Sequence, residues 1–155
     1  MKRINFYRTR DEYGYFSNFS SHPIVINGCQ YKTTEHYFQS QKFAGLAYEK
    51  LIISARSPKE AADLGRAKTH PLRGDWEKIK NDVMLMAILA KFTQHTDLLD
   101  LLLSTGESYI AEHTINDKYW GDGGDDSGQN MLGKILMHVR DSLRNIKLRI
   151  KNENI

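Results

Sequence analysis

Apolar residues recur at two spacings along the chain, and these spacings predict strands near its start and helices after that. Residues 4–8 and the β-branched run 24–26 have the composition of short strands. Asn27-Gly28 follows the second run and is a strong hairpin signal, so Tyr31 is expected on the returning strand. We expect these three short strands to share one small sheet.

Most of the chain that follows has the spacing and the end signals of helices. Thr33 or Thr34 is expected to cap the first helix, which runs to about Ala44, and Ser57-Pro58 begins the third. The expected helices cover about 34–44, 47–55, 58–68, 76–92 and 97–105, and a last helix starts near Asn130.

Two of these helices also show an apolar stripe, and Asp75 and Thr96 are expected N-caps. The stripes are Trp76, Ile79, Val83, Met86 and Ala90 in the long internal helix, and Leu132, Leu136, Val139, Leu143 and Ile146 in the last. A further strand is expected over 109–113. The predicted fold class is therefore α+β: a mostly helical single domain over 1–147 with a small β-sheet, followed by a polar C-terminal tail, 148–155, that frays.

Composition limits the classes of function. The 155 residues are 40% hydrophobic, enough for a core, and the net charge of +3 is too small to indicate nucleic-acid binding by itself. The single cysteine, Cys29, excludes an intrachain disulfide and fits a reducing compartment. No apolar run marks a signal peptide, and none approaches the ~20 residues of a membrane span. We expect a cytoplasmic enzyme.

The first helix places three polar residues on one face. Glu35, Gln39 and Lys42 fall at positions i, i+4 and i+7. A carboxylate, an amide and an ammonium in line suit a polar pocket, but they equally suit a solvated stripe. Spacing alone favours the solvated stripe.

A glycine-rich, acidic loop covers 117–130 and leads into the last helix. Amides at a helix N-terminus can bind an anion, although glycine there is also explained by a tight turn, and both interpretations stay open. The loop lacks the lysine and hydroxyl of a P-loop, the dinucleotide fingerprint and the acidic spacing of an EF-hand.

Two tryptophans stand out, and metal or serine chemistry is not indicated. Trp120 lies in the glycine-rich loop, where an exposed ring face is suited to stacking on a base, whereas periodicity places Trp76 in the core. No histidine pair has a short metal-ligand spacing, and no G-x-S-x-G motif is present. We expect neither a metal nor a cofactor, although Asp122, Asp125 and Asp126 are candidate magnesium ligands.

Motifs in a fixed order connect the chain to a known family. The chain resembles the YbiA-like proteins, also called the NADAR superfamily, from Asn5-Phe6-Tyr7 to about Leu143. The matching blocks are Phe16-Ser17-Asn18-Phe19, Glu35-His36-Tyr37-Phe38-Gln39, Gln41-Lys42-Phe43, Gly65-Arg66, Leu72-Arg73, Asp75-Trp76, Lys91-Phe92, Asp117, Tyr119-Trp120-Gly121, Gly128, Asn130 and Leu132-Gly133.

The resemblance implies cleavage of a ribose C1′–N bond. One activity of the family is hydrolysis of early riboflavin-pathway intermediates, the ribosylamino-pyrimidine phosphates; the other is removal of ADP-ribose from guanine in nucleic acid. The YbiA-like branch is linked with the first, so we expect a small phosphorylated ribosyl substrate. Nucleic acid is a partner only under the ADP-ribose alternative, no membrane is expected, and the oligomeric state is open. A non-catalytic nucleotide-binding module is the other alternative, which intact Glu35 and Asp117 disfavour.

The resemblance also implies roles for particular residues. It places Glu35, Asp117, Trp76 and Trp120 at active-site positions, which reverses the preference for a solvated Glu35 face and a core Trp76. Loss of the base builds positive charge on the sugar, and a carboxylate can stabilise that charge or activate water; Glu35 is our first choice and Asp117 our second. Lys42 is expected to hold a phosphate or to favour the ionised form of Glu35. The other candidate substrate-binding residues are Asn18, which alternatively holds a turn, and Gln39, Arg8, Arg66, Arg73, Gly121 and Asn130.

Overall fold

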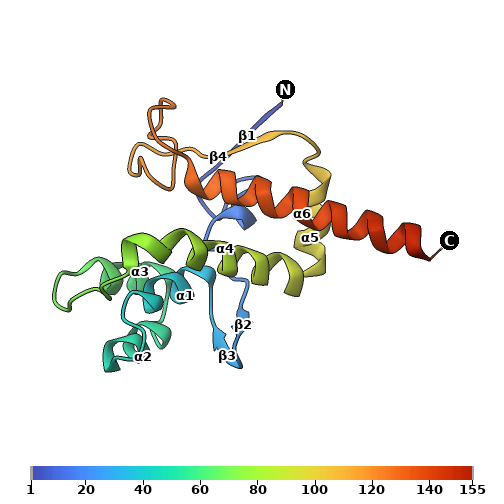
Figure 1. Ribbon diagram of the computed structural model, residues 1–155. Coiled ribbons are helices and arrows are strands. Elements are labelled where there is room, and N and C mark those ends of the chain that lie inside the picture. The colour runs from blue at the N-terminus through green and yellow to red at the C-terminus, as the bar shows by residue number, and fades with distance from the viewer. Residues whose placement is uncertain (1, 155) are drawn as a thin grey trace. The chain divides into compact units, whose positions relative to one another are not determined.

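The computed structural model describes residues 2–154, which form two compact units. Unit 1 contains the chain up to Phe16 and from His95 onward, and unit 2 is Ser17–Gln94. The chain is α+β and mostly helical, as predicted (Figure 1).

Unit 1 is built on a pair of parallel strands. β1 (Arg3–Phe6) pairs with β4 (Tyr109–Glu112), with Ile4 opposite Ile110. The short 3-10 helix η1 (Gly14–Phe16), α5 (Thr96–Ser104) and α6 (Met131–Glu153) complete the unit. In Figure 1, α6 begins close to β4 and continues well past it. The apolar residues that β1, β4 and α6 bury include Ile4, Phe6, Ile110, Leu132, Leu136 and Val139.

The expectation of one sheet shared by the first three strands is wrong. β2 (Ile24–Ile26) and β3 (Cys29–Tyr31) form a separate antiparallel hairpin in unit 2. Asn27 and Gly28 both have positive φ, 52° and 77°, as a tight two-residue hairpin turn requires. β1 instead takes a partner that follows more than a hundred residues later, and strand patterning carries no information about such a distant pairing.

Unit 2 places α1 (Thr34–Gln41) against α2 (Ala47–Ile53), α3 (Pro58–Arg66) and α4 (Trp76–Gln94). Two predicted caps are confirmed, because the hydroxyls of Thr33 and Ser57 accept hydrogen bonds from the amides of His36 and Glu60. The first three of these helices end two or three residues before their predicted ends.

The buried face of α4 differs from the predicted stripe. Met86 is 49% exposed, whereas Met84, Ala87, Ile88 and Lys91 are buried. The Asp75 carbonyl accepts the first hydrogen bonds of α4, from the amides of Lys78 and Ile79, and its carboxylate binds the Arg73 guanidinium at 2.6 Å; capping by the Asp75 side chain stays a prediction. His95 rather than the predicted Thr96 occupies the N-cap position of α5.

The C-terminal residues continue as helix. α6 extends to Glu153, so the predicted polar tail is helical up to that residue and exposed, and its fraying stays a prediction. A polar segment can extend a helix that has already formed, because only the first turn carries the cost of nucleation. Among the described helices, none combines the length and the apolar character needed to cross a membrane.

Candidate active site

Helix α1 carries polar side chains into the interior of unit 2. Every residue from Thr34 to Ser40 is buried, and Glu35 and Gln39 are only 5% and 2% exposed. A solvated stripe is therefore excluded for these two residues. Burial of a carboxylate is costly unless hydrogen bonds compensate it, so its surroundings decide what it can do.

Hydrogen bonds fix Glu35 from two sides. Gln39 donates from Nε2 to Oε1 of Glu35 at 2.8 Å. The backbone amide of Glu35 donates to the Asn18 carbonyl at 3.2 Å. Glu35 also lies in the first turn of α1, where the helix dipole favours a negative charge. The carboxylate is thus held in one place.

Asn18 organises the start of this helix. Its Oδ1 accepts a 2.8 Å hydrogen bond from the Thr34 hydroxyl, and its Nδ2 lies 3.4 Å from the Met84 sulfur. With its carbonyl bound to the Glu35 amide, Asn18 fixes the turn that precedes α1. These contacts account for the turn-holding role of Asn18; binding of a ribose hydroxyl stays a prediction.

Lys42 lies at the C-cap of α1 beside two aromatic rings. Its Nζ is 5.7 Å from the ring centroid of Phe38 and 5.9 Å from that of Trp76, and the two rings are 5.1 Å apart. Burial lowers the pKa of Lys42; the nearby Glu35 charge opposes this, and the positive charges of Arg66 and Lys80 add to it. An aromatic wall and a partly desolvated cation are suited to a planar, anionic ligand.

Gly65 of α3 allows a close approach to Gln39. A Cβ atom at Gly65 would lie 2.0 Å from Oε1 of Gln39, so only glycine fits there. That Oε1 is buried and has no hydrogen-bond partner among residues 2–154. Buried acceptors are almost always satisfied, so this oxygen is an exception in the interior of unit 2.

The second group of predicted residues belongs to the glycine-rich loop of unit 1. Oδ1 of Asp117 accepts 2.8 Å hydrogen bonds from the backbone amides of Tyr119 and Trp120. The Trp120 ring is half-buried and meets the Tyr119 ring edge-to-face at 4.9 Å. Gly121 is buried where a Cβ would come within 2.8 Å of the Asp117 carbonyl. Asp117 therefore folds the loop segment that presents Trp120.

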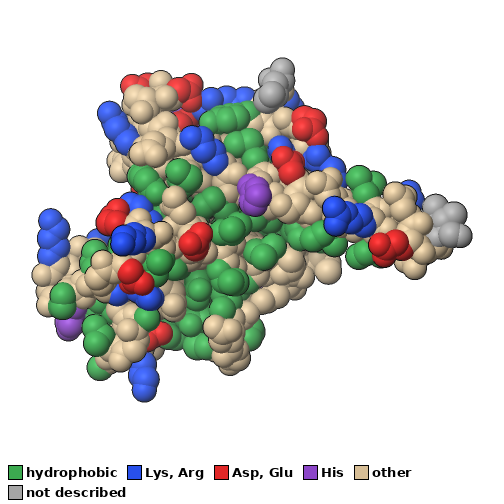
Figure 2. Space-filling model, viewed as in Figure 1, with side chains coloured by type: hydrophobic (Ala, Val, Ile, Leu, Met, Phe, Trp, Pro, Cys, Tyr) green, Lys and Arg blue, Asp and Glu red, His purple; other side chains and the backbone are tan. Residues whose placement is uncertain are grey.

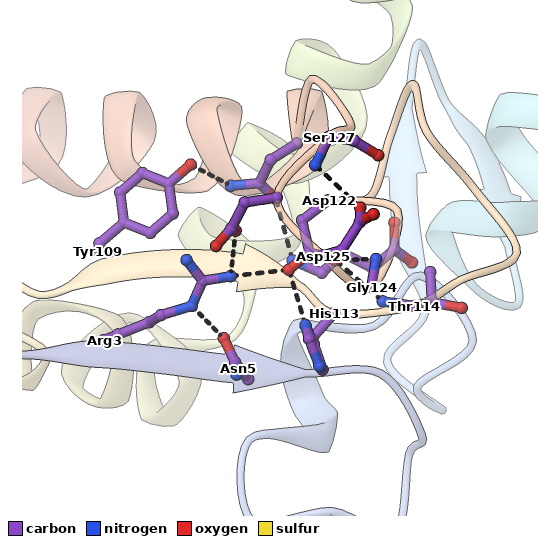
Figure 3. A network of polar contacts seen from close by, with 12 residues as sticks. Arg3, Asn5, Tyr109, His113, Thr114, Asp122, Gly124, Asp125 and Ser127 are labelled. Carbon is purple, nitrogen blue, oxygen red and sulfur yellow. Dashed lines mark hydrogen bonds and ion pairs between the residues drawn. The ribbon is translucent and has the colours of Figure 1, made fainter.

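A network around Asp122 closes the same loop (Figure 3). Its Oδ2 accepts from Arg3 and from Nδ1 of His113, each at 2.7 Å, and its Oδ1 accepts from the amides of Thr114 and Gly124 at 3.2 and 2.8 Å. Burial opposes ionisation of Asp122, but the hydrogen bonds from His113, Gly124 and Thr114 hold its pKa below its ordinary value. Asp122 is thus an ionised structural anchor, a role that its sequence position did not reveal.

The remaining predicted residues are distributed over both units. Asn130 binds within unit 1, donating from Nδ2 to the Ile110 carbonyl at 2.9 Å and accepting from the Glu112 amide at 3.0 Å. Arg8 is exposed in unit 1. In unit 2, Arg73 binds Asp75, whereas Arg66 is exposed and lines a cleft together with Lys42. Substrate binding by these residues stays a prediction.

Sequence patterning did not predict the buried cation of α4. Lys91 of α4 is 0% exposed, and its Nζ donates to the Ser17 carbonyl at 3.0 Å. Desolvation by burial lowers the pKa of Lys91 to about 7. Ser17 directly precedes Asn18, so Lys91 supports the turn from which Asn18 contacts α1. The signals in the sequence were a lysine among apolar neighbours on a helix and the Lys91-Phe92 block of the family resemblance.

His36 and the acidic side chains of the glycine-rich loop are bound to other groups of the protein. His36 is fully buried, with its ring nitrogens bound to the Thr33 hydroxyl and the Ala55 carbonyl, and burial lowers its pKa. Within residues 2–154, no group of three or more His, Cys, Asp or Glu side chains is arranged to hold a metal ion. Asp125 and Asp126 contact Ser127 and Arg3, respectively. Metal-independent hydrolysis stays a prediction.

Comparison with known proteins agrees with the predicted resemblance. The NADAR domain profile matches residues 5–144. N-glycosidase YbiA of Escherichia coli is 50% identical over 140 residues, which are 90% of this chain and 88% of that protein. The NMR structure of E. coli YbiA superposes with a TM-score of 0.88 at 49% sequence identity, and the match covers 95% of this chain and 88% of the NMR chain. N-glycosidase Npun_R5314 of Nostoc punctiforme is 45% identical over 92% of this chain and 94% of its own length. A riboflavin biosynthesis protein of Vibrio vulnificus, VVA0006, is 38% identical over 91% of this chain, which corresponds to 38% of that longer protein.

Proposed function

We propose that this chain, which belongs to the NADAR domain family, hydrolyses the ribose C1′–N bond of a ribosylamino-pyrimidine phosphate and releases ribose 5-phosphate and the free base. The chain is a hydrolase of N-glycosidic bonds, since it shares half of its residues with a protein named N-glycosidase over most of both lengths. The relative named as a riboflavin biosynthesis protein supports the finer substrate assignment, because early intermediates of that pathway are ribosylamino-pyrimidine phosphates.

The observation that carries the proposal is the buried, hydrogen-bonded carboxylate of Glu35. Departure of the base leaves positive charge on the sugar at C1′, and a fixed negative charge beside that atom stabilises the transition state. In the balanced reaction, the C1′–N electron pair leaves with the nitrogen, a water oxygen bonds to C1′, and the proton lost by that water is matched by one taken up by the base. Glu35 is the carboxylate that we assign to C1′.

Asp117 is the second carboxylate in the proposed mechanism. One of its oxygens is occupied by the amides of Tyr119 and Trp120, so its position is fixed by the loop that it folds. A carboxylate so placed suits the transfer of a proton to or from water. Trp120 and Trp76 are proposed to contact the base, Trp120 by stacking and Trp76 through the wall that it forms with Phe38.

The charge distribution favours a small substrate over a polymer. Nucleic-acid binding usually requires several lysine or arginine contacts with successive phosphates. On the face shown in Figure 2, basic and acidic side chains are interspersed instead of forming one broad basic area. The net charge of +3 is consistent with that pattern. A monophosphate needs only one or two cations.

The test is a comparison of two substrates with the purified chain. One reaction contains the ribosylamino-pyrimidine phosphate, and the other contains an oligonucleotide with ADP-ribosylated guanine. We expect free ribose 5-phosphate in the first reaction and no free ADP-ribose in the second. Release from the oligonucleotide alone would overturn the substrate assignment and leave the proposed carboxylate roles in place, because both reactions break a ribose C1′–N bond.

A further inference from the structure

A basic cleft opens beside the aromatic wall of unit 2. It has a volume of about 460 Å³ and is lined by Lys42, Gly65 and the connection from Arg66 to Leu72 that follows α3. Four of its lining side chains are basic, namely Lys42, Arg66, Lys68 and His70, and none is acidic. Figure 2 shows basic side chains and a histidine at the edge of unit 2 where Figure 1 places this connection. This composition selects for an anion.

Two cations of the basic cleft, Arg66 and Lys68, have no acidic partner among residues 2–154. No ion pair involves Arg66 or Lys68 in the part of the chain that the structure describes, although nearby Lys59 and Arg73 each bind an aspartate, at 2.7 and 2.6 Å. The Lys42 ammonium donates a long hydrogen bond, 3.4 Å, to the Gly65 carbonyl. Repulsion between Lys42 and Arg66 is part of what disfavours the charged lysine. A bound anion would relieve it.

The contacts that hold the walls of the cleft involve other residues than Arg66 and Lys68. The Arg73 amide donates to the Lys42 carbonyl at 3.0 Å, which ties the end of the connection to α1. The His70 ring stacks on Tyr48 at 3.8 Å, and the Tyr48 hydroxyl donates to the Leu64 carbonyl at 2.7 Å. Arg73 and Tyr48 thus support the frame, and Arg66 and Lys68 are the side chains that a ligand would meet.

We propose that this basic cleft binds the phosphate of the ribosyl substrate through Arg66, Lys68 and Lys42. The inference rests on the proposed function for the identity of the ligand. Glu35 and Lys42 are seven residues apart on α1, so they lie about 10 Å apart along the helix axis. In ribose 5-phosphate, the furanose ring and one methylene separate C1′ from the phosphate. We assign C1′ to Glu35 and the phosphate to Lys42 and the cleft. Arg73 is bound to Asp75, and its binding of phosphate stays a prediction.

The experiment measures ligand binding apart from turnover. Ribose 5-phosphate and ribose are titrated by calorimetry into the wild-type chain and into the double variant Arg66→Ala/Lys68→Ala. The control variant is Lys50→Ala, which removes an exposed cation of unit 2 outside the cleft. Because charge-assisted hydrogen bonds to phosphate are lost, we expect the double variant to bind ribose 5-phosphate about tenfold more weakly. Ribose binding should be unchanged, and Lys50→Ala should match the wild type.

Three results would overturn the cleft assignment: no binding of ribose 5-phosphate by the wild type, a double variant within twofold of it, or an equal loss of ribose binding. If the pyrimidine substrate is turned over, the double variant should raise KM and leave kcat near the wild-type value. If it is not turned over but ribose 5-phosphate binding depends on Arg66 and Lys68, the proposed function fails and the phosphate site stands.

Discussion

Gln39 donates a 2.8 Å hydrogen bond to one carboxylate oxygen of Glu35, and its own carbonyl oxygen is buried without a partner among residues 2–154. The pair lies one helical turn apart on α1, so the helix itself sets the geometry. The nitrogen of this amide fixes the carboxylate, and its oxygen packs closely against Gly65.

The first prediction follows from this pair. Glu35→Gln preserves size and keeps a side-chain oxygen that accepts from Gln39, but it removes the negative charge. We expect turnover to fall about 10²–10⁴-fold while the melting temperature stays equal or rises. Steady-state kinetics and thermal unfolding provide the measurements, with Glu77→Gln, an exposed position on α4, as the control. A folded Glu35→Gln protein with near wild-type turnover would exclude Glu35 as the catalytic carboxylate.

The second prediction concerns the glycine that faces Gln39. In Gly65→Ala, the new methyl group would lie 2.0 Å from Oε1 and 2.7 Å from Cδ of Gln39, so this buried side chain must move. We expect a loss of about 1–3 kcal/mol in the free energy of unfolding, together with slower turnover because the hydrogen bond to Glu35 is disturbed. Urea unfolding and kinetics are the measurements.

Gly74→Ala provides the matched control for Gly65→Ala. A Cβ at Gly74 meets no atom within 4 Å, so that variant should be as stable and as active as the wild type. Equal behaviour of the two variants would show that the close packing of Gly65 on Gln39 is not needed.

The third prediction separates the two tryptophans. Trp76 is 5% exposed and packs on Phe38 at 5.1 Å, so Trp76→Ala should lower stability by about 3–5 kcal/mol and also reduce activity. Trp120 is half-buried on a loop held by Asp117, so Trp120→Ala should mainly raise KM or reduce kcat. Similar drops in melting temperature for both variants would assign Trp120 a structural role instead.

Local signals in the sequence were sufficient where the chain contacts its own neighbours. The caps at Thr33 and Ser57 and the Asn27-Gly28 turn depend on bonds within a few residues, and all three were predictable. The partner of β1 was not, because β4 is brought to it by the packing of unit 1. The helical spacing of apolar residues also placed Met86 on the buried face of α4, whereas it is exposed. Burial along α4 depends on the elements that pack around each position.

The candidate site shows the same division. Spacing placed Glu35 and Gln39 on one face of a helix. It could not tell a buried face from a solvated one, because polar residues are mostly exposed in proteins. The resemblance to a family resolved that question. The basic cleft remained hidden because Lys42 and Lys68 are far apart in sequence and meet only where α1 and the connection after α3 come together.

The fourth prediction is that hydrolysis needs no metal ion. Acidic side chains of the glycine-rich loop accept hydrogen bonds from protein groups. Asp122 accepts from Arg3 and His113, and Asp125 accepts from the amide of Ser127. Exhaustive dialysis against a chelator should leave the rate within about twofold of its starting value, because carboxylates alone can support glycosidic hydrolysis. A loss that one added metal restores would contradict this.

The last prediction uses the buried ammonium of Lys91 and its depressed pKa of about 7. In the unfolded chain, a lysine keeps its proton up to about pH 10.4. Between these two values the unfolded chain holds a proton that the folded chain lacks, so the contribution of Lys91 to stability rises with pH across this window, by at most about 1.4 kcal/mol per pH unit. Below about pH 7 both states are protonated, and the contribution no longer changes.

Lys91→Met removes the titrating group and fills the same space. The difference in free energy of unfolding, wild type minus Lys91→Met, should therefore increase from pH 7 to pH 10, as measured by urea denaturation at several pH values. Other groups titrate alike in both proteins and cancel. Lys78→Met, the same change at an exposed position of α4, should show no such trend. A flat difference for Lys91→Met would mean that this lysine stays charged in the folded protein, with its ammonium satisfied by more than the Ser17 carbonyl.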